Sequence, residues 1–305
     1  MKTKLFIFLS FLFFTIITSC NIYNPAEPVP AYIHIENMKV KGIDTSSTGQ
    51  GSNSSKITDA WIYIDDQLIG CFEMPCTVPV IADAGNHLLK IRPGIKVNGI
   101  AATRTPYPFY DSYSKSVNLQ SGEITTITSA TVTYNGYMTG VSHFPLIEDF
   151  ESAAGITIDS TQDSETPLTK ITSPTANVFE GTASAVGYVR SSNLTFECAT
   201  VQYYQLNQGT QPVFLEFNYK CNHAFTVSVR GSNISGTTVI NTARVEALTF
   251  NPTESWNKAY LYLSPAIGQL ASMVSANKFK IYFGMRNYQA EDSLGLALDN
   301  IKIVQ

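Results

Sequence analysis

Residues 60–94 read AWIYIDDQLIGCFEMPCTVPVIADAGNHLLKIRPG, and this stretch indicates most clearly which fold class the chain adopts. Four segments in it are rich in strand-favouring residues, with apolar and polar side chains alternating in several of them: 60–64, 68–72, 77–81 and 87–91. Asp65-Asp66, Pro75 and Gly85-Asn86 separate these segments. An apolar residue at every second position is typical of a strand with one buried face. The stretch therefore predicts four strands joined by short turns.

The same kind of pattern continues along the rest of the chain. Further strands are expected in the first half at 32–35, 116–119 and 124–134. In the second half they are expected at 147–150, 183–189, 194–204, 213–219, 224–229, 244–250, 256–263, 278–285 and 296–304. Only 266–276 has helical spacing, with apolar residues at 267, 270, 271 and 274. Many short strands between Gly, Asn and Pro turns favour an all-β chain with two β-sandwich domains, the second a jelly roll.

The segments between these strands suggest how the chain is divided. We expect a signal peptide at 1–19, a proline-rich tether at 20–31, a first domain at 32–134, a linker at 135–143 and a second domain at 144–305. The tether contains three prolines, which favour extended backbone. Residues 44–55 are mostly Ser, Thr, Gly and Asn, so they are expected to form a mobile, exposed loop.

The composition limits the classes of partner. The 305 residues are 44% hydrophobic but only 14% charged, and they include 16 Tyr and 17 Phe. Abundant aromatic residues suit exported β-sheet proteins better than helical bundles. The net charge of −4 and the absence of a basic stripe argue against nucleic acid as a partner.

The N-terminus has the features of an export signal. Lys2 and Lys4 precede an apolar run over 5–17, which is followed by Thr18-Ser19-Cys20. A run of this length is too short for a membrane span, which needs about 20 apolar residues. An ordinary signal with an incidental cysteine is one interpretation.

Ile17-Thr18-Ser19-Cys20 also resembles the lipobox of bacterial lipoproteins. The resemblance implies cleavage before Cys20, lipidation of that residue and an outer-membrane location, on either the periplasmic or the surface face. Two Asp-Ser motifs, at 159–161 and 292–294, resemble the O-glycosylation pattern of Bacteroidetes, which agrees with export.

Each half of the chain resembles a known family of β modules. Residues 60–94 resemble the PEGA domains of bacterial envelope proteins, with Asp65-Asp66 at the turn, Gly70 and Pro75 in the middle and Gly85-Asn86-His87 before the next strand. The extra residues 71–74 depart from that pattern. The resemblance implies a structural or adhesive role.

The second half resembles galactose-binding-like and carbohydrate-module-like jelly rolls. Its opening residues 147–151 (IEDFE) and closing residues 297–303 (ALDNIKI) carry the resemblance, together with 181–184 (GTAS) and Trp256. Such modules include sugar binders and domains without a known ligand, so the resemblance implies a fold and not a function.

No pattern in the sequence names a catalytic reaction. The four histidines are scattered, and Ser142 lacks the second glycine of a nucleophile elbow. Acidic residues such as Asp65 and Glu180 cannot be paired from the sequence into the two carboxylates of a glycosidase. We therefore expect a non-enzymatic protein.

Glu148, Glu151 and Asp299 are the candidates for a metal site. Carboxylate and carbonyl oxygens suit Ca²⁺, and the opening and final strands of a jelly roll are expected to pair, which would bring these residues together. The alternative is that Asp299 caps a turn while the glutamates are solvated. Apart from this structural calcium, no cofactor is expected.

Aromatic side chains are the candidates for ligand contacts. Tyr107, Phe109, Tyr110 and Tyr113 cluster in the loop TPYPFYDSYS at 105–114, and ring faces stack on sugars. Tyr203-Tyr204 and Tyr288 could contribute in the second domain. Packing against a sheet is the commoner role of such rings, and Trp61 and Trp256 are expected in the core.

Four cysteines remain once Cys20 is assigned to the lipid. Cys71 and Cys76 flank a four-residue turn, while Cys198 and Cys221 flank a longer loop. Two hairpin disulfides are expected in an exported chain, and four free thiols are the alternative.

Together these observations predict a lipid-anchored envelope protein with a binding, adhesion or assembly role. The alternative is a surface lipoprotein that binds or processes carbohydrate. The expected partners are the membrane, through the lipid, and either a glycan or another envelope protein.

Overall fold

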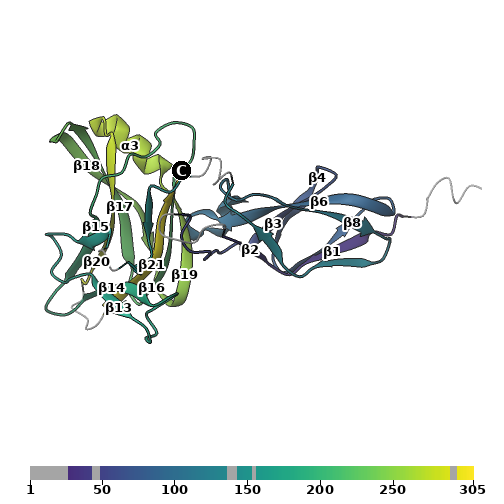
Figure 1. Ribbon diagram of the computed structural model, residues 1–305, viewed down its shortest axis with the longest axis horizontal. Coiled ribbons are helices and arrows are strands. Elements are labelled where there is room, and N and C mark those ends of the chain that lie inside the picture. Colours follow the sequence, from purple (N-terminus) through teal and green to yellow (C-terminus); the bar gives the residue numbers. More distant parts are fainter. Residues whose placement is uncertain (1–26, 43–48, 136–142, 153–155, 289–293) are drawn as a thin grey trace, which may run out of the picture.

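The computed structural model describes residues 27–42, 49–135, 143–152, 156–288 and 294–305. These residues form two β-sandwiches that lie end to end along the long axis of the molecule (Figure 1). The predicted all-β class is therefore confirmed. Cys20, the Asp292-Ser293 part of the motif at 292–294 and most of the expected linker lie outside the described residues.

The first sandwich contains two principal sheets and a short strand pair. One sheet has the order β5-β1-β9, and the other has the order β4-β3-β6-β7 with β8 also paired to β6. Strands β10 and β2 form the separate pair. Its strands are β1 (Ala31–Ile35), β2 (Met38–Val40), β3 (Asp59–Ile64), β4 (Gln67–Glu73), β5 (Cys76–Val80), β6 (Gly85–Lys96), β7 (Arg104–Pro106), β8 (Tyr113–Leu119), β9 (Ile124–Ile127) and β10 (Ala130–Val132).

The stretch 60–94 forms the four predicted strands, β3 to β6. Asp65 and Asp66 have φ angles of 49° and 64°, the left-handed backbone that a tight hairpin turn requires. The Asp65 carboxylate accepts a hydrogen bond from the Leu88 N–H at 2.8 Å, which ties this turn to β6. Pro75 lies between strands of different sheets, because β4 pairs with β3 whereas β5 pairs with β1.

The second sandwich also packs two sheets face to face. One has the order β13-β14-β21-β16-β19 with β11 paired to β21, and the other has the order β12-β15-β20-β17-β18. Its strands are β11 (Leu146–Glu148), β12 (Ile158–Ser160), β13 (Thr169–Thr172), β14 (Ala183–Val189), β15 (Thr195–Thr200), β16 (Phe214–Cys221), β17 (Phe225–Ser235), β18 (Thr238–Phe250), β19 (Thr253–Tyr262), β20 (Lys278–Arg286) and β21 (Leu294–Val304). The predicted helix is α3 (Ser264–Val274), which packs on β17 and β18.

The opening and final strands of this sandwich pair, as the sequence predicts. Strand β11 runs antiparallel to β21, with Ile147 opposite Lys302. The inner faces of the two sheets form a core rich in aromatic side chains, in which Phe225 and Phe250 stack at 5.0 Å between ring centroids. The two sheets are therefore closed over one continuous core.

Apolar side chains of both sandwiches meet at the junction between them. Phe214, Tyr260 and Val304 of the second sandwich are buried in the core cluster of the first. The ring of Tyr107 lies 5.1 Å from the rings of both Phe214 and Tyr260, between centroids. The junction is therefore built like a protein interior and not like a flexible contact.

A buried carboxylate lies at the centre of this junction. Glu216 on β16 accepts hydrogen bonds from the hydroxyls of Tyr107 at 2.7 Å and Tyr134 at 2.9 Å. The Lys258 ammonium lies 3.3 Å from the same carboxylate, and both side chains are almost inaccessible to solvent. A buried charge is costly unless it is paired and hydrogen-bonded, so these partners hold the two sandwiches in one arrangement.

The described part of the segment at 44–55, which is residues 49–55, differs from the exposed loop expected from its composition. Its first described part turns into the junction, where Gln50 is fully buried. The Lys302 ammonium donates hydrogen bonds to the carbonyl oxygens of Gln50 at 2.6 Å and Ser52 at 2.9 Å. Burial lowers the pKa of Lys302 to about 7. The expectation fails because a buried lysine of the second sandwich needs acceptors, and this loop supplies them.

Candidate ligand-binding face

The outer face of the β14–β21–β16–β19 sheet is the candidate functional surface. Side chains of β16 alternate between the core and this face, which places Glu216, Asn218 and Lys220 outside. The first sandwich covers the Glu216 end of the face, through Tyr107 and Tyr134. The Lys220 end remains open, because no element of the first sandwich lines it.

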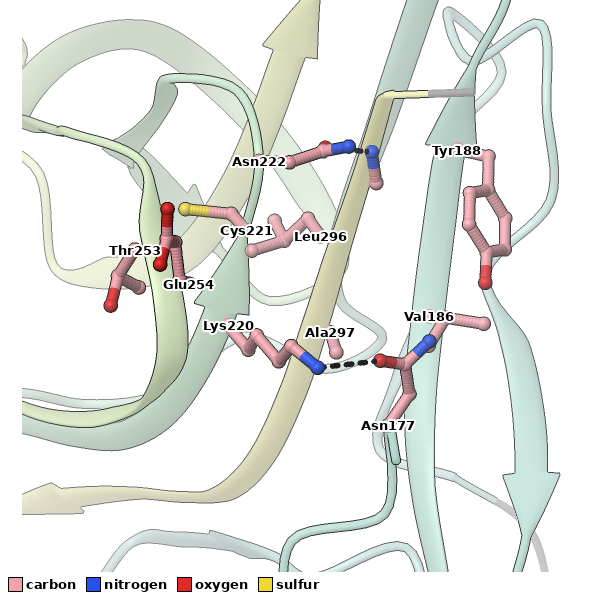
Figure 2. Close-up of a pocket in the computed structure, with 11 residues that line it drawn as sticks. Asn177, Val186, Tyr188, Lys220, Cys221, Asn222, Thr253, Glu254, Leu296 and Ala297 are labelled. Carbon is pink, nitrogen blue, oxygen red and sulfur yellow. Dashed lines mark hydrogen bonds between the residues drawn. The ribbon is translucent and has the colours of Figure 1, made fainter. Parts of the chain in front are cut away.

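A cleft of about 340 Å³ occupies the open end of this face (Figure 2). Its floor consists of small or short side chains from two neighbouring strands, namely Val186 on β14 and Gly295 and Ala297 on β21. Tyr188 lies on one side and Glu254, at the start of β19, on the opposite side (Figure 2). The small floor residues therefore leave a depression between taller side chains.

The ring of Tyr188 forms an aromatic wall of the cleft. Tyr188 is opposite Gly295 in the β14–β21 pair, and a Cβ added at Gly295 would lie 3.0 Å from Cε1 of the ring. The absence of a side chain at Gly295 thus lets the ring lie close to the sheet. Tyr188 is half-buried, so part of the ring remains open to the cleft.

Groups that form hydrogen bonds surround this ring. The Lys220 ammonium points toward Asn177 and lies 3.4 Å from both Asn177 Oδ1 and the carbonyl oxygen of Ala176 (Figure 2). These long contacts leave donor capacity for a ligand. Asn222 is already fixed, since its Oδ1 accepts a bond of 2.7 Å from the Gly295 N–H.

Trp256 holds the loop that carries Asn177. Its indole N–H donates to the carbonyl oxygen of Ala176 at 3.3 Å, and its ring lies 5.3 Å from that of Phe179. The expectation of a core tryptophan is wrong here, because Trp256 lies half-buried on the outer face. Trp61 is likewise half-buried, on β3 of the first sandwich.

The arrangement suits a polyhydroxylated ligand better than an apolar one. One ring face, an ammonium, a carboxylate and side-chain amides converge on a shallow depression. Hydroxyl groups both donate and accept hydrogen bonds, and ring C–H surfaces pack on aromatic faces.

The three acidic residues predicted to bind calcium do not form one cluster. Glu148 accepts bonds from the Phe150 N–H at 2.8 Å and from Thr157, and Glu151 accepts them from Thr182 and Ala183. Within the described ranges, three metal-ligating side chains nowhere come together.

Asp299 is buried and has donors of its own. It accepts a bond of 2.7 Å from each of the Ser184 hydroxyl and the Asn300 N–H. Burial raises the pKa of Asp299 to about 7. Neighbouring N–H and O–H groups therefore take the place that the sequence-based hypothesis gave to a cation.

The predicted aromatic ligand loop is also corrected by the structure. Tyr107, Phe109 and Tyr110 are at most 5% exposed and pack in the junction, and Tyr113 is half-buried on β8. Tyr107, Phe109 and Tyr110 are therefore core residues of the junction. Tyr203 and Tyr204 lie outside the cleft, and Tyr288 is 83% exposed.

The four cysteines that the structure describes are free thiols. Cys71 on β4 and Cys76 on β5 belong to different sheets, as do Cys198 on β15 and Cys221 on β16. Neither pair of strands forms a hairpin and all four thiols are free, which contradicts the predicted hairpin disulfides.

Sequence reasoning missed the residues of the cleft, although part of the signal was present. In 183–189 (ASAVGYV) small or apolar residues face inward at every second position, which places Tyr188 outside. A large aromatic residue on the solvent side of a strand is a reasonable binding candidate. Its position opposite Gly295 depends on strand register, which the sequence does not reveal.

Comparisons with known proteins give resemblances of fold. No family model matches the chain, and no curated protein matches it. A family 11 carbohydrate-binding module of the cellulase Lic26A-Cel5E of Clostridium thermocellum is 12% identical, with 53% of this chain and 94% of that module covered and a TM-score of 0.37. A family 30 carbohydrate-binding module is 15% identical, with 55% and 89% covered and a TM-score of 0.37. A xylan-binding domain is 14% identical, with 52% and 93% covered and a TM-score of 0.32.

At this level of similarity the neighbours carry no argument about the ligand.

Of the helices in the described ranges, none has both the length and the apolar character of a membrane span.

Proposed function

We propose that this chain binds glycans without chemical conversion and that the Tyr188 cleft receives the saccharide. The observation that carries the proposal is the position of the Tyr188 ring, which lies close to the sheet beside Gly295. The ring lines the cleft together with Lys220 and Asn177. An aromatic wall beside several hydrogen-bonding groups fits the C–H faces and hydroxyls of a sugar.

The cleft supports binding and not hydrolysis. Among the described residues that line it, Glu254 is the one carboxylate. Most glycosidases use two carboxylates on either side of the scissile bond, about 5–10 Å apart. The proposal therefore assigns no catalytic role to this face.

We further propose that Cys20 carries a lipid that anchors the chain to an outer membrane. The Ile17-Thr18-Ser19-Cys20 sequence supports this anchor. The chain enters the first sandwich beside the β8–β9 turn, where the Ser121 hydroxyl bonds to Val29 O at 2.9 Å and the Gly122 N–H bonds to Pro30 O at 2.9 Å. This turn lies at the end of the first sandwich remote from the second (Figure 1). An anchored first sandwich would thus act as a spacer that presents the cleft away from the membrane.

A glycan array probed with the full chain tests the binding proposal. We expect binding to neutral oligosaccharides, and we expect Tyr188→Ala to abolish most of it because the aromatic wall is lost. Tyr288→Ala is the matched control, since that tyrosine is 83% exposed and lines no part of the cleft. Absence of binding to any glycan, or equal loss in both variants, would contradict the proposal.

A further inference from the structure

A second hollow lies at the junction of the two sandwiches, on a different set of residues from the Tyr188 cleft. It has a volume of about 480 Å³. The first sandwich contributes Lys56 and the turn after β6, and the second contributes the end of β18 and half of β19. We call this hollow the junction groove. Thr253 is the one residue that lines both the groove and the cleft.

The described residues that line the junction groove include positive charges and no carboxylate. Its residues include Lys56, Lys96 and Lys258, and none of them is Asp or Glu. The charge of Lys258 is balanced by the carboxylate of Glu216, which lies behind the groove. The charge of Lys96 is balanced by Glu73, whose carboxylate lies 2.7 Å from the Lys96 ammonium. Among the described residues, no carboxylate lies within ion-pair distance of Lys56.

The described hydrogen-bond partners of Lys56 are neutral groups. Its ammonium donates to Asn257 Oδ1 at 2.6 Å, and its backbone N–H donates to the Tyr260 hydroxyl at 3.0 Å. Burial and the nearby charge of Lys96 lower the pKa of Lys56. Two neighbouring cations thus repel each other beside a groove, and an anion between them would relieve that repulsion.

The remaining walls are suited to a ring with polar substituents. Leu248 and Pro252 provide apolar surface, and Asn251 provides an amide. Asn98 accepts a hydrogen bond from the Tyr262 N–H at 3.0 Å, which fixes the turn of the first sandwich against β19. The groove therefore does not need to be assembled by its ligand.

We infer that the junction groove binds an acidic saccharide unit, whose carboxylate or sulfate group contacts Lys56 and Lys96. The saccharide part of this inference rests on the proposed glycan-binding function, whereas the anion recognition rests on the lysines of the groove. A charge-assisted hydrogen bond to Lys56 supplies specificity for the acidic group.

The test compares four probes on the full chain by calorimetry. These are a neutral tetrasaccharide, an oligogalacturonate of equal length, a sulfated tetrasaccharide and inorganic sulfate. We expect at least one acidic oligosaccharide to bind, with affinity that falls as salt is added. We expect Lys56→Gln to weaken that binding about tenfold, as for one charge-assisted hydrogen bond. Binding of the neutral probe should be unchanged by Lys56→Gln.

Two controls separate a local effect from loss of structure or of overall charge. Lys115→Gln removes the same charge from an exposed position on β8 that lines neither the junction groove nor the Tyr188 cleft, and it should leave all affinities unchanged. Lys56→Arg keeps the charge and should retain the binding of the acidic probe.

Several results would overturn the inference. These are no binding of either acidic oligosaccharide, equal binding by wild type and Lys56→Gln, or binding of inorganic sulfate as tight as that of the sulfated tetrasaccharide. Its failure is distinct from failure of the proposed function, which Tyr188→Ala and the neutral probe report. Binding of an acidic oligosaccharide that depends on Lys56 and not on Tyr188 would support the groove alone.

Discussion

The hydroxyl of Tyr107 in the first sandwich donates a hydrogen bond of 2.7 Å to the Glu216 carboxylate in the second. Tyr107 is 1% exposed and Glu216 is fully buried. The carboxylate also accepts from Tyr134 and lies beside Lys258, so one polar network spans both sandwiches. Because water is excluded, each member depends on the others for hydrogen bonds and charge balance.

Removal of the central carboxylate should destabilise the whole chain. Glu216→Ala leaves Lys258 buried without its counter-charge, and we expect a loss of about 3–5 kcal/mol in the free energy of unfolding. Urea-induced unfolding measures this loss. Glu246→Ala, at an exposed position on β18, is the control, and an equally small loss in both variants would refute the structural role of Glu216.

Asp299 should make stability depend on pH. Burial raises its pKa to about 7 in the folded chain, above the unfolded value. The contribution of Asp299 to the free energy of unfolding is therefore fully present below about pH 4, and it is lost as the pH rises through about 7. Asp299→Asn cannot titrate, so wild type should lose stability relative to this variant over that range. The exposed control Asp163→Asn should follow wild type, and parallel curves for wild type and Asp299→Asn would contradict the assignment.

A side chain at Gly187 should destabilise the fold, because the core leaves no space for it. A Cβ at this position on β14 would overlap the ring of Phe196 in the core. We expect Gly187→Ala to cost about 1–3 kcal/mol through overpacking. At Gly284 on β20, the nearest atom to an added Cβ is 3.8 Å away, so Gly284→Ala should be close to neutral. Thermal unfolding compares the two variants, and equal melting temperatures would show that the core accommodates the methyl group.

The thiols should differ in reactivity according to burial. Cys198 is fully buried, and burial raises the pKa of Cys221 to about 11, so neither should react with a maleimide in the folded chain. Cys71 and Cys76 are half-buried and should react more readily. Peptide mass spectrometry assigns each site, with urea-unfolded protein as the control. A disulfide recovered between any two of these cysteines would contradict the arrangement described above.

Local periodicity predicts the strands well because one face of each is buried by its own sandwich. The segment 183–189 coincides with β14, and most of the other expected segments overlap a strand. The short strands β2 (Met38–Val40), β7 (Arg104–Pro106), β12 (Ile158–Ser160) and β13 (Thr169–Thr172) were not predicted. Three or four residues contain too few alternations to distinguish a strand from a loop.

Burial at the junction could not be predicted from periodicity, because it depends on how the two sandwiches meet. Tyr107 and Gln50 lie in segments with loop-like composition, and the second sandwich buries both. Lys302 lies on the outer face of β21 and is buried only because the first sandwich covers it. The Tyr188 cleft has the same origin, since it is the part of that face which the first sandwich leaves open.

The central claim is that this open part of the face is the ligand site, and hydrogen–deuterium exchange tests it most directly. The full chain is compared with and without a saturating oligosaccharide selected on the glycan array. Our account predicts slower exchange in peptides that contain Ala183–Val189 and the start of Leu294–Val304, with no change in peptides from 107–113. Protection confined to any other part of the chain would contradict the assignment of the Tyr188 cleft.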